Sequence, residues 1–541
     1  MAKKHTLEEL SNCSREELIT LVLMMQGQLE ALNENIEKLI EQVRLANSYR
    51  FGKHTETLDS IDGQLSFFDE AECFCDLQVS EPTPEEVLPV KQSKKKRGKR
   101  EMDLKEFPEE ILPSYSVSVE ELDAFYGKGN WRRLPDETFK RLRHEPESWT
   151  VEVHTVEVYV GTDGDHQDEF LRGNRPKDLL RNSIVTPSLL ASILNVKYVN
   201  SSALHRIEQE FERNGVNISR QTMSNWIMRC SEKYFGPFVE RMKEELLSLH
   251  VTQSDETPTQ VIGDSDHPNS KCYMWVHRSG EFYGDRPIVI YEYHKGRDHK
   301  RPLEFYKDYN GILVTDSLQQ YHLIEKKLTN VTNANCWAHA RRSFADAVKI
   351  ADKKEPKSVK QSVAYQALQK IGEFYAADTE LKMLSSQERL QKRQDLIKPL
   401  VEEFFAWVKE QIELCSVPPK SKTGEGLRFI INQEKYLRVF LEDGDVPIDN
   451  SASERSIRTF CLGKKNWMFH NTANGAAASA LVYSISETAK LNHLRPYYYF
   501  KYILTELPNF CDEQGNIDSA KLDDLMPWSD KLPDECRKPR R

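Results

Sequence analysis

Three acidic residues, Asp255, Asp316 and Glu454, stand out as candidates for chemistry in this 541-residue chain. Both aspartates follow short stretches that we interpret as β-strands, and the glutamate lies at the predicted start of a helix. Carboxylate oxygens are the ligands that Mg²⁺ prefers. Two such ions about 3.5–4 Å apart can activate an attacking oxygen and stabilise a leaving one. The three residues therefore predict metal-dependent phosphoryl transfer, provided that the fold brings them together.

Each of these residues also has a structural interpretation. An isolated aspartate at a strand end is more often a turn or cap residue. Ser451 and Glu454 have the spacing of a capping box, so the glutamate could close a helix start instead of binding a metal. Arg458 lies one helical turn after the glutamate, and Lys464 and Lys465 follow it. Cationic side chains beside a carboxylate suit a metal next to a phosphate backbone, which favours the functional interpretation.

The segments around the two aspartates are predicted to form a sheet. Three consecutive strands, a short helix and a further strand are the outline of an RNase H-like core. In that topology, an aspartate in the middle of the sheet and one at the end of the fourth strand lie side by side. The expected strands cover residues 250–254, 272–277, 288–293, 311–315 and 331–336, and the helix covers residues 298–306.

The composition is that of a globular protein with three or more domains, since 541 residues are too many for one core. Hydrophobic residues make up 39% of the chain and charged residues 30%. No apolar run reaches the roughly 18 residues of a membrane-spanning helix, and no signal-peptide pattern begins the chain. We therefore expect a cytoplasmic protein with no membrane partner. The ten cysteines form no CxxC pair, which favours reduced thiols over a metal site.

The net charge of −10 argues weakly against a nucleic-acid partner, but the distribution of basic residues matters more. Residues 91–100 hold seven basic side chains in ten positions, which form either a solvated linker or a contact for DNA phosphates. A second basic cluster surrounds the helix that begins near Glu454. The candidate DNA contacts are Lys94, Lys95, Lys96 and Arg97 in the first cluster and Arg455, Arg458, Lys464 and Lys465 in the second.

A heptad pattern within residues 1–50 predicts self-association. Apolar residues alternate at steps of four and three, with mostly β-branched residues at one core position and mostly Leu at the other. This pattern favours a parallel dimeric coiled coil, and the alternative is an amphipathic helix packed on its own protein. The heptad core residues are Leu18, Val22, Met25, Leu29, Leu32, Ile36, Leu39 and Val43.

Residues 51–105 are interpreted as a linker, and residues 106–180 as a small, partly β domain with a strand over 150–160.

Residues 181–235 show the outline of a helix-turn-helix. Apolar stripes predict two helices, Gly215 breaks the chain after them, and Ser219 can cap a third helix. A helix rich in Arg, Gln, Ser and Asn after a glycine turn is typical of DNA recognition, although an ordinary helical hairpin is the alternative. The residues of this helix that are candidates for contacts with DNA are Arg220, Gln221 and Asn225.

Five short motifs occur in a fixed order: Ser254–Pro258, Thr315-Asp316 with Tyr321, Cys336–Phe344, Asp449–Arg458 and Leu462–Trp467. In this order they resemble the motifs of insertion-sequence-66 family transposases. The resemblance also covers the heptads, Arg50-Phe51-Gly52, the basic linker, the helix-turn-helix and residues 483–491, so it extends over nearly the whole chain. Any one motif is modest evidence, but their shared order is highly specific.

The resemblance implies an Asp-Asp-Glu transposase in which Asp255, Asp316 and Glu454 are the metal ligands. The cofactor would be two Mg²⁺ ions, for which Mn²⁺ can substitute. The DNA partners would be the terminal inverted repeats of a mobile element and the target DNA, so the protein would be associated with the nucleoid when active. Some relatives use accessory transposition proteins, which would be further partners.

The resemblance also implies a domain organisation. We expect a multidomain α/β protein in which a helical insertion interrupts an RNase H-like catalytic core. Glu454 lies 138 residues after Asp316, which leaves room for such an insertion, and the intervening sequence is rich in predicted helix. The expected boundaries are 236–345 and 441–475 for the core, 346–440 for the insertion and 476–541 for a C-terminal element.

Two departures from the family pattern stand out. Members usually carry a cysteine zinc-binding module between the basic linker and the helix-turn-helix, but no cysteine occurs here between Asp76 and Arg229. We interpret the stretch over 150–160 as a remnant of that module held by packing alone, which argues against zinc as a cofactor. In addition, residues 317–319 replace the usual small or glycine-containing turn after Asp316, which bears on the geometry of this aspartate.

Two other functions fit the same residues. A related metal nuclease, such as a junction resolvase, would cut DNA without joining it. A non-catalytic DNA-binding regulator descended from a transposase would need no metal, although the presence of all three carboxylates argues against such decay. His339, three residues after Cys336, is interpreted as a packing or supporting residue, and Trp467 as a core residue.

Overall fold

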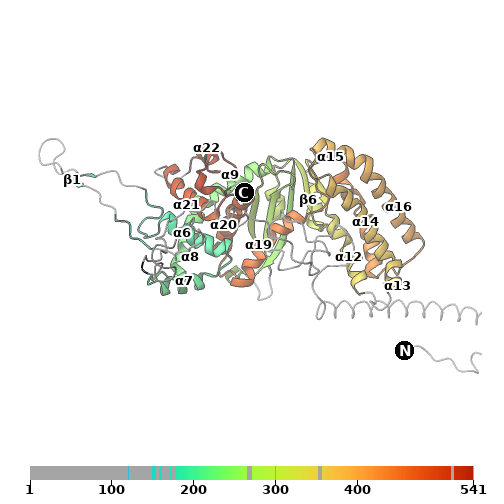
Figure 1. Ribbon diagram of the computed structural model, residues 1–541, viewed down its shortest axis with the longest axis horizontal. Helices are drawn as coiled ribbons and strands as arrows, with labels where there is room; N and C mark the ends of the chain where they lie inside the picture. Colours follow the sequence, from blue (N-terminus) through green and yellow to red (C-terminus); the bar gives the residue numbers. More distant parts are fainter. Residues whose placement is uncertain are drawn as a thin grey trace, which may run out of the picture. The chain divides into compact units, whose positions relative to one another are not determined.

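The computed structural model describes Glu120 and residues 149–153, 158–160, 170–172, 177–264, 271–298, 300–350, 356–512 and 517–539 (Figure 1). The chain forms two compact units, one of residues 1–75 and 177–538 and one of residues 76–176 and 539–541. The predicted coiled coil, and the basic linker with Lys94, Lys95, Lys96 and Arg97, lie outside the described residues. Self-association through the heptads therefore stays a prediction. Among the described residues, no helix is long and apolar enough to cross a membrane.

The smaller unit contains a short β-ribbon. Strand β1 (Val158–Val160) pairs antiparallel with β2 (Phe170–Arg172), with Tyr159 opposite Leu171. The strand predicted over 150–160 is therefore confirmed only at its end. Val151 and Val153 are 89% and 86% exposed and belong to no strand.

The larger unit begins with a helical region. Thr186 caps α6 by accepting a hydrogen bond from the backbone of Leu189 at 3.2 Å. Gly215, with φ of +76°, makes the turn after α7, and Ser219 caps α8 as predicted. Two helices joined by a glycine turn are thus present where the sequence predicts them. The elements are α6 (Pro187–Leu194), η2 (Asn195–Val199), α7 (Leu204–Arg213), α8 (Arg220–Cys230), η3 (Ser231–Phe235) and α9 (Gly236–Leu247).

A five-stranded mixed sheet in the order β5-β4-β3-β6-β7 forms the centre of this unit. Strands β3, β4 and β5 are antiparallel neighbours, whereas β6 runs parallel to both β3 and β7. All five predicted strands are present, and a short helix separates the third from the fourth. The elements are β3 (Val251–Thr259), η4 (Ile262–Asp264), β4 (Cys272–Ser279), β5 (Val289–Lys295), α10 (Lys300–Phe305), β6 (Gly311–Thr315), α11 (Gln319–Lys327) and β7 (Val331–Asn335).

The first strand is longer than the sequence predicts. We expected it to end before Asp255, but β3 continues to Thr259 because β4 pairs with it as far as Cys272. Asp255 therefore lies inside the strand, opposite Val276, and not in a loop. The pairing with β4 holds the backbone of Asp255 more firmly than a strand end would, whereas the parallel pairing with β6 ends at Gln253.

The outer edge of β5 is covered by a helix. Ser484 and Thr488 of α20 accept hydrogen bonds from the backbone N–H groups of Tyr291 at 2.8 Å and Val289 at 3.0 Å. These side chains satisfy groups that an open edge would present to other strands. The C-terminal elements are α19 (Ser451–Trp467), α20 (Ala473–Leu491), α21 (Pro496–Glu506), η7 (Leu507–Phe510), α22 (Ser519–Leu522), η8 (Asp523–Leu525) and η9 (Asp534–Cys536).

Between β7 and α19 the chain forms a helical insertion with its own core, at the β6 side of the sheet in Figure 1. Trp337 is fully buried there, with its ring centroid 4.7 Å from that of Phe374 and 5.9 Å from that of Phe404. The helices of residues 187–247 and the C-terminal helices share a second core with the rest of the sheet. The elements are α12 (Trp337–Ile350), α13 (Pro356–Gln361), α14 (Val363–Glu380), α15 (Ser386–Lys392), η5 (Arg393–Ile397), α16 (Lys398–Glu413), α17 (Lys422–Asn432), α18 (Glu434–Leu437) and η6 (Val439–Leu441).

Candidate active site

The sheet places one aspartate within β3 and the other directly after the neighbouring strand β6. Strands β3 and β6 are parallel, and Gln253 lies opposite Val314. Asp255 and Asp316 each lie two residues further along, so the register brings them side by side, as the sequence predicts. One Oδ atom of Asp255 accepts the backbone N–H of Glu256 at 2.8 Å. The expected pair of carboxylates is therefore present in the middle of the sheet, at β3 and the end of β6.

A buried asparagine fixes the start of the glutamate helix against β3. The side-chain amide of Asn450 donates to the backbone oxygen of Ser254 at 2.8 Å, and its Oδ1 accepts from Nε2 of Gln253 at 3.1 Å. Its backbone N–H donates to Sγ of Cys336 at 3.1 Å. These bonds attach the first turn of α19 to the strand beside Asp255. They explain why an asparagine stands four residues before the glutamate in the sequence.

Glu454 lies in the first turn of α19 but does not cap it. The N-cap residue is Asn450, no side chain makes a capping hydrogen bond, and the capping-box interpretation is therefore wrong. The side chain of Glu454 is only 12% exposed, and its buried Oε1 has no hydrogen-bond partner. Nδ1 of His339 is 3.5 Å from this oxygen, which is too long for a strong bond. A buried carboxylate oxygen without a donor suits a cation that the described residues do not supply.

Burial and repulsion between neighbouring carboxylates raise the pKa of all three residues. Burial raises the pKa of Asp255 well above its usual range, and the charges of Glu256, Asp316 and Glu454 add to this effect. Burial, with the charge of Glu256, raises the pKa of Asp316 to about 7. Burial also raises the pKa of Glu454 to about 8, against the nearby guanidinium group of Arg342. The carboxylates are thus close enough to repel one another, and a divalent cation would relieve that repulsion.

The donor set fits a hard cation that is completed by substrate. Within the described ranges, no three acidic, His or Cys side chains are grouped closely enough to hold one ion by themselves. Mg²⁺ does not require such a cage, because it is usually bound by one or two carboxylates together with waters and substrate phosphates. Asp255, Asp316 and Glu454 offer oxygen ligands from two strands and one helix. They are therefore the residues that could contribute ligands to such a cation.

A fourth carboxylate lies behind the site. The side chain of Glu256 is fully buried, accepts a hydrogen bond from the Tyr321 hydroxyl at 2.6 Å and pairs with Arg297, whose Nε is 2.6 Å away. Because neighbouring residues of a strand point to opposite faces, Glu256 faces away from α19 while Asp255 faces it. Neither Glu256 nor Arg297 was predicted from the sequence to belong to the site. The adjacency of two acidic residues was the only signal for Glu256, and Arg297 lies in a loop without a motif.

The predicted DNA-contacting cations lie in different surroundings. Arg458 and Arg342 lower the pKa of Glu454, so both lie near it. Arg455 instead points to Glu281, with which it forms an ion pair at 3.4 Å, and Nζ of Lys464 donates to the backbone oxygen of Pro258 at 2.6 Å. Of the second basic cluster, the structure therefore brings Arg458 to the carboxylates but not Arg455. Lys465 is exposed near the end of α19, and Arg220, Gln221 and Asn225 are exposed on α8.

The raised pKa values predict an unusual dependence of stability on pH in the metal-free protein. The pKa values of Asp316 and Glu454 in the folded protein, about 7 and about 8, exceed the ordinary values of 3.8 and 4.5. The folded state therefore holds more protons than the unfolded state between about pH 4 and pH 8. The stability that these two groups confer is present below this window and is lost as the pH rises through it.

Thermal or denaturant unfolding in EDTA at pH 5 and pH 8 measures this effect. In a protein carrying both Asp316→Asn and Glu454→Gln, the loss of stability between the two pH values should be smaller than in the parent, by about 1–3 kcal/mol. The comparison cancels the contributions of other titrating groups. An equal loss in both proteins would contradict the assignment of weakly acidic carboxylates.

Comparison with known sequences gives a consistent result. Residues 182–478, which include all three carboxylates, match a family described as Transposase IS66 family, and residues 484–528 match the IS66 C-terminal element. Two relatives are uncharacterized proteins of Sinorhizobium fredii (strain NBRC 101917 / NGR234). One, y4qI, is 26% identical over 520 residues, which cover 93% of this chain and 90% of the relative. The other, y4hP, is 26% identical over 352 residues, which cover 64% of this chain and 62% of the relative.

Proposed function

This chain belongs to the IS66 transposase family, and we propose that it is an enzyme that cuts the ends of a mobile DNA element and joins them to target DNA. The observation that carries this proposal is the convergence of Asp255, Asp316 and Glu454 from β3, β6 and α19. The strand order, with three antiparallel strands followed by two parallel ones, supports an RNase H-like assignment for the sheet.

In this proposal Asp255, Asp316 and Glu454 hold two Mg²⁺ ions, for which Mn²⁺ can substitute. When bound, the ions supply charge stabilisation for an in-line displacement at phosphorus. The residues of the chain orient the DNA: Arg342 and Arg458, which lie beside the carboxylates, would contact phosphate oxygens. Water first displaces the 3′ oxygen of the element strand, and the freed 3′-hydroxyl then attacks a phosphate of the target strand and displaces the 3′ oxygen of that strand, which leaves as a new 3′-hydroxyl end. No covalent intermediate with the enzyme is needed.

We propose that α8 reads the terminal repeats. Arg220, Gln221 and Asn225 are exposed on this helix, and Nε2 of Gln221 lies 3.2 Å from Oδ1 of Asn225, so both amides can present one shared surface to base edges. Two subunits joined through the heptads of residues 1–50 could hold two element ends together.

Replacing Arg220 and Asn225 by Ala should reduce the preference for element-end DNA over scrambled DNA by about 10- to 100-fold, because base-edge contacts each contribute about 1–3 kcal/mol of discrimination. Competition binding with both DNAs measures this ratio. Lys521→Ala, an exposed cation on α22, is the control and should keep the parent ratio. An unchanged ratio in the Arg220 and Asn225 variant would show that α8 is part of an ordinary helical hairpin.

A gel assay with the full chain and labelled DNA carrying the element ends tests the proposed function. We expect cleavage and strand transfer that require Mg²⁺ or Mn²⁺ and that stop in EDTA. Cleavage without joined products would favour the metal nuclease. Binding that is indifferent to EDTA, without cleavage under any condition, would favour the non-catalytic regulator.

A further inference from the structure

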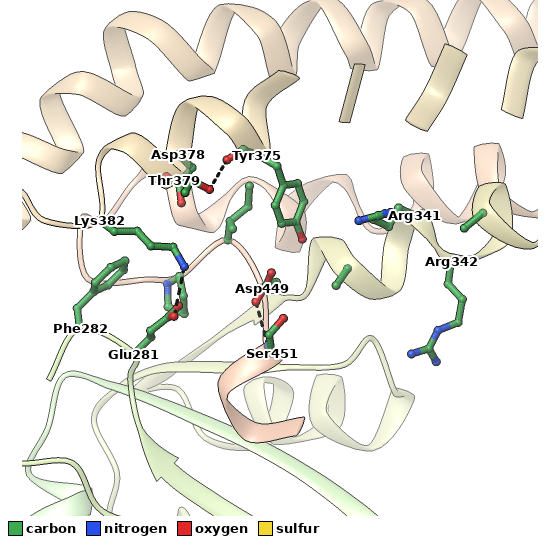
Figure 2. A pocket seen from close by; sticks show the side chains of 14 residues that line it. Glu281, Phe282, Arg341, Arg342, Tyr375, Asp378, Thr379, Lys382, Asp449 and Ser451 are labelled. Carbon is green, nitrogen blue, oxygen red and sulfur yellow. Dashed lines mark hydrogen bonds and ion pairs between the residues drawn. The ribbon is translucent and has the colours of Figure 1, made fainter. Parts of the chain in front are cut away.

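A pocket lies between helices α12 and α14 of the insertion, the loop after β4 and the start of α19 (Figure 2). Helix α12 contributes Arg341 and Arg342 to its wall, and α14 contributes Tyr375. The loop that leads into α19 contributes Asp449, which is five residues before Glu454. Arg342 belongs to both places, since it lines the pocket and also lowers the pKa of Glu454. Ser451, in the first turn of α19 together with Glu454, also lines the pocket, so the pocket lies next to the helix that carries Glu454.

Positive charge predominates around this pocket once its ion pairs are considered. Three lining carboxylates, Glu281, Asp378 and Asp449, face three lining cations, Arg341, Arg342 and Lys382. Two of these carboxylates have cationic partners from outside the lining. Arg393 binds Asp378 at 2.7 Å, and Arg455 binds Glu281 at 3.4 Å, in addition to Lys382 at the same distance from Glu281. With Glu281 and Asp378 paired in this way, the guanidinium groups of Arg341 and Arg342 face one remaining lining carboxylate, Asp449, which favours an anionic ligand.

A hydroxyl group inside the pocket lacks a partner. The ring of Tyr375 extends from α14 toward Asp449 in Figure 2, and its buried hydroxyl oxygen makes no hydrogen bond. Burial and the nearby charge of Asp449 raise the pKa of this hydroxyl well above its usual range, so it stays protonated and can donate. Buried polar groups are rarely left unpaired in folded proteins. The carboxylate of Asp449 lies near this donor but is too poorly placed for a regular hydrogen bond, so a phosphate oxygen that arrives with a ligand could accept from the hydroxyl instead.

We propose that this pocket binds a phosphodiester group of the DNA strand next to the scissile phosphate, with Arg341, Arg342 and Tyr375 as the donors. Guanidinium groups present paired N–H donors that match phosphate oxygens, and the hydroxyl of Tyr375 adds one more donor. The inference rests on the proposed function and extends it, because it assigns the insertion a direct part in holding the substrate strand. The insertion would then fix the position of the strand relative to Glu454.

The test is a scan of single neutral methylphosphonate groups along the strand, with DNA binding measured in EDTA for proteins in the Glu454→Gln background. The background protein should lose affinity, about tenfold, when the modification lies at one or two phosphates beside the scissile one. Adding Arg341→Gln should weaken binding to unmodified DNA by a similar factor and reduce the slope of log affinity against log salt by about one. With Arg341→Gln, a methylphosphonate at those positions should cause no further loss.

Two further variants sharpen the test. Tyr375→Phe keeps the packing of the ring and should reduce the loss caused by the same modified phosphates, while its thermal stability stays at or above that of the parent. Arg428→Gln, an exposed arginine on α17, is the matched control and should keep the whole profile of the background protein. Full sensitivity to every methylphosphonate in the Arg341→Gln protein would overturn the proposal.

The source of the phosphate is distinguished in a separate measurement. If inorganic phosphate stabilises the parent but not Arg341→Gln against thermal unfolding, while the methylphosphonate scan is flat, the pocket binds free phosphate and the DNA assignment is wrong. The scan measures binding alone. A parent protein that binds DNA with the expected profile but never cuts it would therefore contradict the proposed function and not this inference.

Discussion

Replacing Glu454 by Gln should abolish DNA strand cleavage, with a loss of about 10³-fold or more, while DNA binding is retained. The substitution keeps the shape of the side chain but removes the negative charge that a metal ion needs, and the charge stabilisation lost with the metal amounts to several kcal/mol. The helix should remain intact, because Glu454 makes no capping bond that Gln would lose. Single-turnover cleavage of labelled end DNA in Mg²⁺ measures the effect.

The control for this substitution is Glu413→Gln, which makes the same chemical change at an exposed position near the end of α16. It should cleave DNA like the parent. In EDTA at pH 8 the Glu454→Gln protein should be at least as stable as the parent, because one repelling carboxylate is gone. Parent-like cleavage by a folded Glu454→Gln protein would remove this residue from the site.

Replacing Arg393 by Met should destabilise the protein by about 3–5 kcal/mol, because it leaves a buried carboxylate without its partner. The side chains of Arg393 and Asp378 are 0% and 2% exposed, and Nε of the arginine is 2.7 Å from Oδ1 of the aspartate. Nη1 of Arg393 also donates to the backbone oxygens of Phe440, Asp443 and Val446 at 2.9, 3.1 and 2.7 Å. Denaturant unfolding measures the loss of stability.

The same arginine connects the insertion to the loop that leads into α19. The chain that Arg393 holds at Val446 reaches Asn450 four residues later, so its loss should also increase hydrogen exchange of the backbone over residues 440–450. Combining Arg393→Met with Asp378→Leu removes the lone charge and should restore part of the stability. Lys398→Met, on the exposed face of α16, should leave both measurements unchanged. A loss below about 1 kcal/mol for Arg393→Met would contradict a role for this pair in holding the loop.

Patterns local to the chain could be predicted well from the sequence. The five strands and the capped helix after Gly215 depend on neighbouring residues, and the structure has them where periodicity and capping residues indicate. The pairing of Asp255 with Asp316 followed from a known sheet topology once the strands were identified. Glu454 required more than local pattern. Its capping-box spacing had two interpretations, and only the observed N-cap at Asn450 separates them.

Contacts between distant segments could not be predicted in the same way. Arg393 and Asp378 lie on separate helical segments, and the backbone oxygens that complete the arginine site carry no sequence signal. Arg455 points to Glu281 because the loop after β4 packs against α19, and local sequence patterns do not predict this tertiary contact. The donors gathered in the pocket likewise come from α12 and α14, which only tertiary packing brings together.

If Asp255, Asp316 and Glu454 are metal ligands, replacing Asp316 by Cys should change the metal preference of the enzyme. A thiolate is a poor ligand for Mg²⁺ and a better one for softer divalent ions such as Co²⁺ or Zn²⁺. The measurement is the ratio of the cleavage rates of variant and parent in each metal. We predict a ratio close to zero in Mg²⁺ that rises at least about tenfold in a softer ion that also supports the parent. A ratio that is the same in every metal, whether near one or near zero, would contradict direct ligation by Asp316.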